Sequence, residues 1–209
     1  MKYELIKLTK ANEFYGSKVK YQIKALKNFN GITKGDLGGY VQNEHNLSQE
    51  GNCWLKDKAR VYDNAQVLDN ARIAGSAIIC DNATVSGTAL IYNTAKIYDN
   101  AKVFNASIIF NNAAIFGDAK VFGNAFIHSV AEVAGDASVT KRVFSTWYDT
   151  YNITGTDYHL RIGCQQHTYE KWWNFDNKVI AEMDKDALIW WKKWKPILMA
   201  IFENSSNKN

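Results

Sequence analysis

The sequence predicts a mainly β protein: a left-handed parallel β-helix of about five triangular coils, with a small N-terminal β cap and a C-terminal hairpin plus a Trp-rich α-helical segment. Three observations predict this class. A small residue recurs at every sixth position from Cys53 to Ala137, a Leu, Val or Ile follows two positions later, and Asp, Asn or Gly usually follows after two more. A period of six matches neither a helix nor an ordinary strand, whereas three six-residue sides close a triangular coil.

The repeat is regular along its whole length. Thirteen of its fifteen small positions are Ala, the exceptions being Cys53 and Ser107, and the branched positions from Leu55 to Val139 hold one Leu, seven Val and seven Ile. Two residues that are two positions apart point to the same side of an extended segment, so each pair fills the interior. Gly, Asn and Asp form the corners because they tolerate left-handed backbone geometry. We therefore expect residues 53–140 to form the prism.

Both ends of such a solenoid expose unpaired strand edges and need caps. We assign residues 1–52 to a first cap of short strands, in which the glycine-rich turn KGDLGGYV leads to the first coil. Residues 141–209 form the second cap, with a hairpin over YNITGTDYHLRIG and helices from about Thr168. Pro196 is expected to kink or restart the last helix.

Composition, charge and cysteine count argue against several classes of protein. The 209 residues are 46% hydrophobic and carry a formal net charge of +4, which argues against disorder and does not by itself indicate nucleic acid or membrane binding. The three cysteines make no disulfide framework. The sequence has neither a signal peptide nor an apolar run that could span a bilayer, so we expect a reducing, intracellular setting.

One known group shares these features. The run GDLGGYVQNEHNLSQEGNCWLKDKARVYDNA, the hexads after it and the run HLRIGCQQHTYEKW resemble hexapeptide-repeat proteins carried by bacteriophages and prophages. The resemblance covers roughly residues 20–175. It implies a left-handed β-helix, a phage origin and therefore the host bacterial cytoplasm, but no settled activity and no catalytic residues. The Trp-rich end after Phe175 departs from that group.

Many left-handed β-helices are acyltransferases that use acetyl-CoA or an acyl-carrier protein. Their chemistry needs a histidine base in a cleft between neighbouring prisms, with ejected loops around the acyl carrier. The hexads here run without an insertion, and the only histidine among them, His128, occupies an outward position where we expect it to stack over Phe110. We therefore predict no catalytic residue and no cofactor, and keep an acyl-CoA-dependent acyltransferase with an inter-subunit active site as the alternative.

The other histidines and cysteines give no stronger signal. His45, His159 and His167 lie outside the coils at spacings that match no ligand motif, so we expect no metal site. Cys164 and His167 could form a nucleophile pair, although a role in the cap and its turn is favoured.

Outward side chains eighteen residues apart should stack into faces of the prism. On the first face the outward residues are apolar over most of its height, and an apolar strip of that size needs a cover. The cover would be an identical subunit, the chain's own tail or a foreign partner; alternatively, the stacked aromatics only stiffen the coils. The predicted partner- or oligomer-binding residues of this face are Trp54, Leu90, Tyr92, Ile108, Phe110 and Phe126.

The tail DKDALIWWKKWKPILMAIF has apolar residues at helical spacing. We expect an amphipathic helix packed on its own prism or on a sister subunit. The alternatives are a protein partner, RNA stacked on the tryptophans and neutralised by the lysines, and, less favoured, a membrane surface. The residues predicted to bind in this segment are Trp190, Trp191, Lys192, Lys193 and Trp194.

The functional hypothesis combines these points. We expect a non-enzymatic, phage-type binding protein, free or as a homo-oligomer, that presents rigid faces and a Trp/Lys-rich tail to a macromolecular partner. The partner would be a host protein or ribonucleoprotein, and the effect would be inhibition of an antiviral defence complex in the manner of an anti-CRISPR protein. A structural component of the phage particle is a further alternative.

Overall fold

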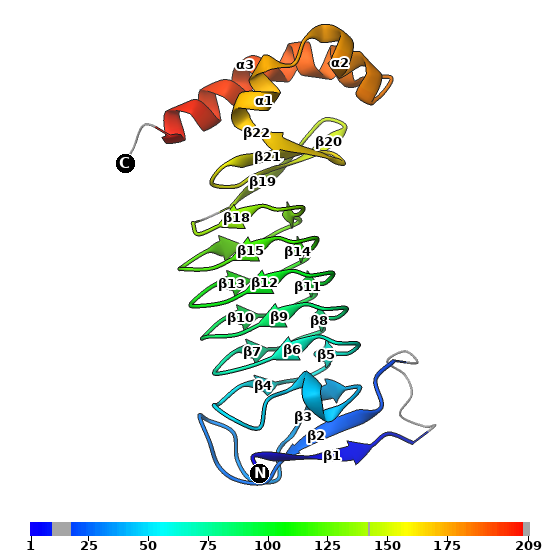
Figure 1. Cartoon of the computed structure of the whole chain (residues 1–209), viewed down its shortest axis with the longest axis vertical. Helices are drawn as coiled ribbons and strands as arrows, with labels where there is room; N and C mark the ends of the chain where they lie inside the picture. The colour runs from blue at the N-terminus through cyan, green and yellow to red at the C-terminus, as the bar shows by residue number, and fades with distance from the viewer. Residues whose placement is uncertain (10–17, 142, 207–209) are drawn as a thin grey trace.

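The centre of the chain is a column of stacked coils with a cap at each end (Figure 1), in a computed structural model that describes residues 1–9, 18–141 and 143–206. Each coil has three short strands, one on each face. The first face contains β4 (Trp54–Leu55), β7 (Arg72–Ile73), β10 (Leu90–Ile91), β13 (Ile108–Ile109) and β16 (Phe126–Ile127). The second contains β5 (Arg60–Val61), β8 (Ile78–Ile79), β11 (Lys96–Ile97), β14 (Ala114–Ile115) and β17 (Glu132–Val133). The third contains β6 (Gln66–Val67), β9 (Thr84–Val85), β12 (Lys102–Val103), β15 (Lys120–Val121) and β18 (Ser138–Val139).

Strands of adjacent coils pair in parallel with a register of eighteen residues, as the hexads predict. Leu90 pairs with Ile108, and Ile91 with Ile109. The Ala and Val or Ile phases are fully buried along the column, so the interior is one continuous apolar core. The exception at Ser107 is also buried, and its hydroxyl donates to the Phe104 carbonyl oxygen at 2.8 Å, which satisfies the polar group.

The corners have the geometry that their residue types predict. Every sixth residue from Asp57 to Gly135 has a φ between 55° and 69°. Where a corner holds Asp, its carboxylate can also accept the backbone N–H of the corner in the next coil, as Asp57 does from Gly75 and Asp69 does from Gly87. Corner residues therefore fix both the turn within a coil and the spacing between coils.

The N-terminal end adds a partial sixth turn that the hexads do not show. The strands β1 (Tyr3–Lys7), β2 (Tyr21–Ala25) and β3 (Leu37–Val41) pair antiparallel, and Tyr40–Val41 of β3 then pairs in parallel with Arg60–Val61. A 3₁₀ helix, Glu44–Asn46, follows, and Leu47 bridges to Val67 on the third face. The solenoid therefore has about six turns and begins before Cys53.

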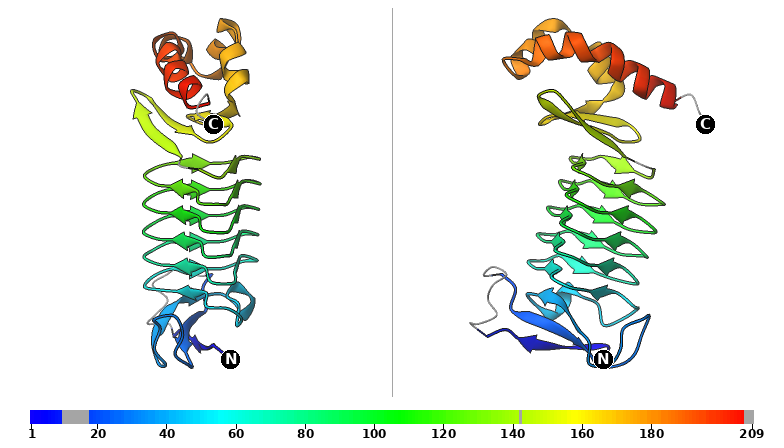
Figure 2. Two further views of the ribbon diagram at one scale, coloured as in Figure 1. Left: turned by 90° about the vertical axis from the view of Figure 1, so that its left-hand side faces the viewer. Right: turned by 180° about the vertical axis from the view of Figure 1, so that it is seen from behind.

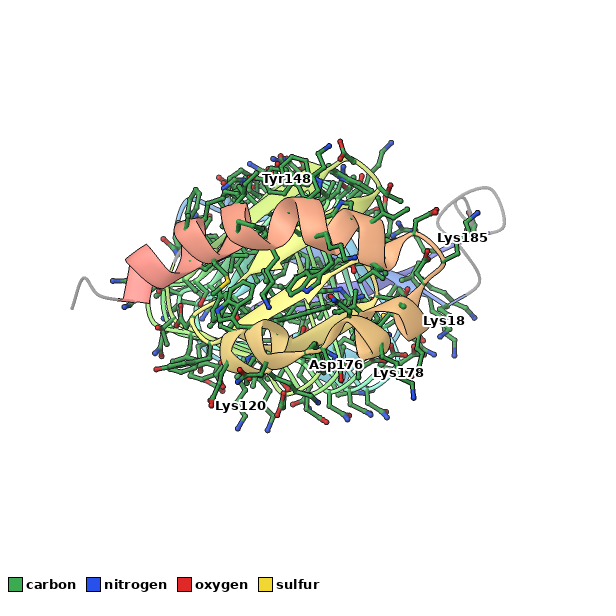
Figure 3. All side chains as sticks on the ribbon, turned by 90° about the horizontal axis from the view of Figure 1, so that it is seen from above. Lys18, Lys120, Tyr148, Asp176, Lys178 and Lys185 are labelled. Atoms are coloured by element: carbon green, nitrogen blue, oxygen red, sulfur yellow. The ribbon has the colours of Figure 1, made fainter. Side chains whose placement is uncertain are left out.

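The C-terminal cap is larger than the predicted hairpin. Four antiparallel strands, β19 (Phe144–Tyr148), β20 (Tyr151–Gly155), β21 (His159–Ile162) and β22 (Gln165–Thr168), form a sheet across the end of the column. Three helices follow: α1 (Tyr169–Asn174), α2 (Asn177–Met183) and α3 (Ala187–Ser206). From above, α3 lies along one side of this end and α2 along the other, with cap strands between them (Figure 3). α3 continues through Pro196, so the expected restart of the helix is wrong.

Side chains of this cap satisfy backbone groups at the last coil. Asn152 Nδ2 donates to the Val130 carbonyl oxygen at 3.0 Å, and Gln166 Nε2 donates to that of Ala134 at 2.6 Å. Such bonds close the edge of the solenoid against further strands. Figure 2 shows that the caps close opposite ends and that no described element covers the middle coils. Among the described helices, none has both the length and the apolar character needed to cross a membrane.

Candidate functional site

An apolar row of side chains on the open coils, which we call the first-face strip, is formed by Leu90, Tyr92, Ile108, Phe110 and Phe126. In each two-residue strand the second residue points into the core, so the first residue points outward; Leu90, Ile108 and Phe126 are therefore aligned in one row. All five side chains are half-buried. The strip is thus an accessible apolar ladder on a rigid sheet.

Stacked rings form the second row of the strip. The rings of Tyr92 and Phe110 have centroids 5.1 Å apart and are nearly parallel, at 8°. His128 continues the stack above Phe110, at 5.6 Å and 30°, as predicted. Similar parallel pairs occur beside the other two faces, Tyr98 with Phe116 and Phe104 with Phe122. Stacked rings therefore stiffen all three sides of the column. Only on the first face does a row of aliphatic and aromatic side chains, Leu90, Ile108 and Phe126, lie next to the stacked rings.

The N-terminal cap covers the first face below the strip, at Trp54. Trp54 is only 4% exposed, because Phe29 packs edge-on against it at 5.5 Å and Tyr3 at 6.5 Å. Arg72 Nη2 donates to the Asn30 carbonyl oxygen at 2.7 Å, which fixes the loop in this position. Trp54 is therefore an intramolecular contact, and the accessible strip begins at Leu90.

A recess lies where this loop meets the strip. It has a volume of about 520 Å³, and its lining includes Ile32, Trp54, Arg72, Leu90 and Tyr92. The Arg72 guanidinium places a positive charge beside the apolar row. At the other end, the backbone of Phe126 pairs with Lys141 and Val143, so the strip is framed by both caps.

His128 lies in a packed, aromatic environment. Its ring contacts Phe110 and Phe126, both at 5.6 Å between centroids, and Nδ1 lies 2.7 Å from the Ser129 hydroxyl. These are the contacts of a surface aromatic residue, and they support the interpretation of His128 as part of the ladder.

The tryptophans of the tail are mostly interior. Trp190 is 6% and Trp191 is 3% exposed, and both belong to the hydrophobic core of the C-terminal cap. Trp194 is half-buried against Tyr148 and donates its indole N–H to Asp149 at 2.9 Å, while Lys193 forms an ion pair with the same carboxylate at 2.7 Å. The helix therefore packs on its own chain, and of the predicted set only Lys192 and Lys193 are exposed.

Sequence reasoning missed an exposed aromatic residue in this cap. Trp147 on β19 is 60% exposed, and it borders a groove of about 550 Å³ that also contains Glu132 and Arg161. Arg161 Nε donates to Glu132 at 2.9 Å, and the guanidinium lies over the Phe116 ring at 5.4 Å. The strand FSTWY has no clean alternation of apolar and polar residues, so no signal distinguished Trp147 from a core residue.

The predicted alternatives for catalysis gain no geometric support. His167 on β22 packs edge-on against Trp172 and Phe175, and burial, with a smaller contribution from Lys171, lowers its pKa. Cys164 lies in the exposed turn between β21 and β22. Within the described residues, no three His, Cys, Asp or Glu side chains lie close enough together to bind one metal ion.

Comparison with known proteins yields a short similarity. No protein-family model matches the chain. A segment of 40 residues is 42% identical to an uncharacterized acetyltransferase, YdcK, from Escherichia coli strain K12. The segment covers 19% of this chain and 12% of that protein. Forty residues equal the length of little more than two coils of eighteen residues, and similarity to an acetyltransferase fits the solenoid fold.

Proposed function

We propose that this chain is a non-enzymatic binding protein that presents the first-face strip to a macromolecular partner. The observation that carries the proposal is the strip itself: five half-buried apolar side chains on a rigid sheet, framed by two caps that leave them uncovered. Isolated exposed apolar residues are ordinary, whereas a contiguous patch marks an interaction site.

Physical chemistry supports a partner at this place. Fully burying an exposed Leu, Ile or Phe side chain contributes about 1.5–3 kcal/mol. The five side chains are already half-buried, so a partner that covers them gains about half of that amount from each. The parallel backbone bonds hold the rows in position before binding, which lowers the entropic cost of association. Arg72 at the lower edge adds a charge that can select an acidic neighbour on the partner.

Capture of partners by matched variants tests this proposal. Leu90→Glu with Ile108→Glu puts two charges into the strip, and Thr84→Glu with Lys102→Glu puts two at the equivalent hexad positions of the third face. We expect a tagged wild-type chain and the third-face variant to retain the same partner and the strip variant to lose it. If both variants lose the partner, or if neither does, the binding surface cannot be assigned to the first face.

The finer proposal names the partner as a host antiviral defence complex. It is supported by the resemblance of the entry and exit sequences to phage proteins, not by the fold. Expression of the wild-type chain should restore plaque formation by a restricted phage on a defence-proficient strain, and the strip variant should fail to do so. Equal plaque counts with and without expression of the chain would contradict the proposal that the partner is a defence complex. Because Trp190 and Trp191 are buried and Lys193 is paired with Asp149, an RNA contact at the predicted tail residues would depend mainly on Lys192 and the half-buried Trp194.

Acyl transfer is the second candidate, and the observation in its favour is the short similarity to an uncharacterized acetyltransferase. The active site would have to form between subunits, with His128 as the base. A thermal-shift titration with acetyl-CoA separates the two functions, because an acyltransferase should be stabilised by its acyl donor. Saturable stabilisation that His128→Ala reduces would favour the enzyme over the binding protein.

A further inference from the structure

The C-terminal cap contains a small cavity that lies away from the first-face strip. Its walls come from the cap sheet and from all three helices, with Tyr151 on β20, Trp172 on α1, and Trp190 and Trp191 on α3. Its volume is about 60 Å³. One water needs ~10–15 Å³ by the same measure, so the cavity is too large for a single water and too small for a nucleotide or an acyl-CoA.

Four of the described residues of the lining are aromatic, and their rings pack against one another. Tyr151 and Trp190 pack edge-on, with centroids 5.1 Å apart, and Trp172 and Trp191 are 5.3 Å apart. The indole N–H of Trp172 donates to the Leu160 carbonyl oxygen at 2.6 Å, and that of Trp190 donates to the Tyr148 carbonyl oxygen at 2.7 Å. Because these polar groups are already bonded elsewhere, the two indoles present no free N–H to the cavity.

Among the described residues that line the cavity, the one charged side chain is acidic. Asp184, directly after α2, is exposed at the cavity mouth. Its pKa is lowered by the backbone N–H of Asp186, at 3.0 Å, and by the Tyr151 hydroxyl, so the carboxylate stays ionised. The buried Tyr151 hydroxyl lies beside the same carboxylate, so the two groups form a polar edge of the lining.

The cap already pairs several of its aromatic rings with cations, including Trp191, which also lines the cavity. Lys195 Nζ lies over the Trp191 ring at 5.4 Å, and Lys193 Nζ lies over the Trp194 ring at 4.8 Å. Neither lysine is among the described residues that line the cavity, and those residues include no basic side chain. The cavity thus combines several aromatic walls and one carboxylate with no cation of its own.

We propose that this cavity binds the methylated ammonium group of a small organic cation such as choline. A quaternary ammonium gains from aromatic surfaces through cation–π attraction and from the nearby carboxylate through charge, and its methyl groups match the apolar walls. The remainder of the ligand would project past Asp184 into solvent. The proposal is independent of the first-face strip and of any partner bound there.

Calorimetric titration of the full-length chain with choline chloride tests the proposal, with 3,3-dimethylbutan-1-ol as the neutral molecule of the same shape. Choline should bind saturably, and the neutral analogue should bind at least about tenfold more weakly, because a desolvated cation–π contact and a charge pair are both lost. Glycine betaine should also bind more weakly than choline, since its carboxylate approaches Asp184. Absence of saturable binding by choline, or equal binding of the neutral analogue, overturns the proposal.

Surface variants locate the site without disturbing the aromatic core. Asp184→Asn should weaken choline several-fold and leave the neutral analogue unchanged, whereas Glu182→Gln, exposed on α2 and outside the lining, should change neither. Unchanged choline affinity in Asp184→Asn would place the cation elsewhere and also overturn the assignment. Flotation with phosphatidylcholine vesicles distinguishes the source of the group: co-flotation abolished by Asp184→Asn indicates a lipid headgroup, and its absence with intact choline binding indicates a free solute.

Discussion

The ammonium nitrogen of Lys2 lies 3.2 Å from the sulfur of Cys53, and both side chains are fully buried at the base of the column. Lys2 also donates to the Glu50 carbonyl oxygen at 3.1 Å. Burial raises the pKa of the Cys53 thiol, and the neighbouring ammonium opposes that shift. The pair explains why the first small position of the repeat is Cys rather than Ala: the sulfur is a hydrogen-bond partner for a cation of the cap.

Replacing Lys2 should destabilise the fold. Lys2→Met keeps the length of the side chain but leaves its buried acceptors without a donor, and we expect the free energy of unfolding to fall by ~1–3 kcal/mol. Lys7→Met, exposed on β1, is the matched control and should change it by less than ~0.5 kcal/mol. Urea denaturation measures both; a Lys2→Met variant as stable as the control would show that the buried contacts contribute nothing.

The asparagine ladder along one corner should contribute a smaller amount. Asn64 Nδ2 donates to Asn82 Oδ1, and Asn82 Nδ2 donates to Asn100 Oδ1, both at 3.1 Å. Asn82→Ala breaks both bonds, for an expected loss of ~0.5–1.5 kcal/mol because they are solvent-exposed. Asn124→Ala, at the same position of its hexad, serves as the control in thermal unfolding. Equal midpoints for the two variants would argue against the ladder.

The C-terminal cap should lose stability in mild acid. Burial lowers the pKa of His167 in the folded chain, so the unfolded chain binds a proton at higher pH than the folded one. The stability that neutral His167 contributes is complete above about pH 6.5 and is lost as the pH falls through the lowered value. His167→Gln should flatten the pH dependence of tryptophan fluorescence unfolding between pH 7.5 and 5. The same slope in both proteins would assign the effect to another group.

The strip also makes a prediction about assembly. If a second copy covers the first face, Leu90→Glu with Ile108→Glu should reduce the mass measured by light scattering to that of one chain, whereas Thr84→Glu with Lys102→Glu should leave it unchanged. A wild-type mass of one chain, 23.7 kDa, would leave the strip free for a different partner. A higher mass that the strip variant does not reduce would place the subunit interface on another surface.

The repeat could be predicted almost residue by residue, because each hexad position meets the same environment in every coil. The corners follow from local backbone preference alone, as at Asn93 and Gly117. Neither cap has such a period. Nothing near Trp54 in sequence indicates that Phe29 covers it, and the burial of Trp190 and Trp191 depends on a four-stranded sheet whose first strand carries no regular alternation.

The same contrast separates the accessible from the inaccessible part of the candidate site. Leu90 and Ile108 were placed correctly because their orientation depends only on the hexad. Trp54 was placed correctly on the first face, but its exposure depended on a loop from outside the repeat. Contacts between the repeat and its caps are long-range, and a single sequence carries little information about them.

Photo-crosslinking in cells tests the central claim, that the first face is a binding surface, most directly. A photoreactive phenylalanine analogue would replace Tyr92 in the strip and, in a separate variant, Phe104 beside the third face, since both rings stack on a ring of the next coil. We predict one defined crosslinked product from position 92 and none from position 104. No product at position 92, or the same products at both positions, would contradict the account.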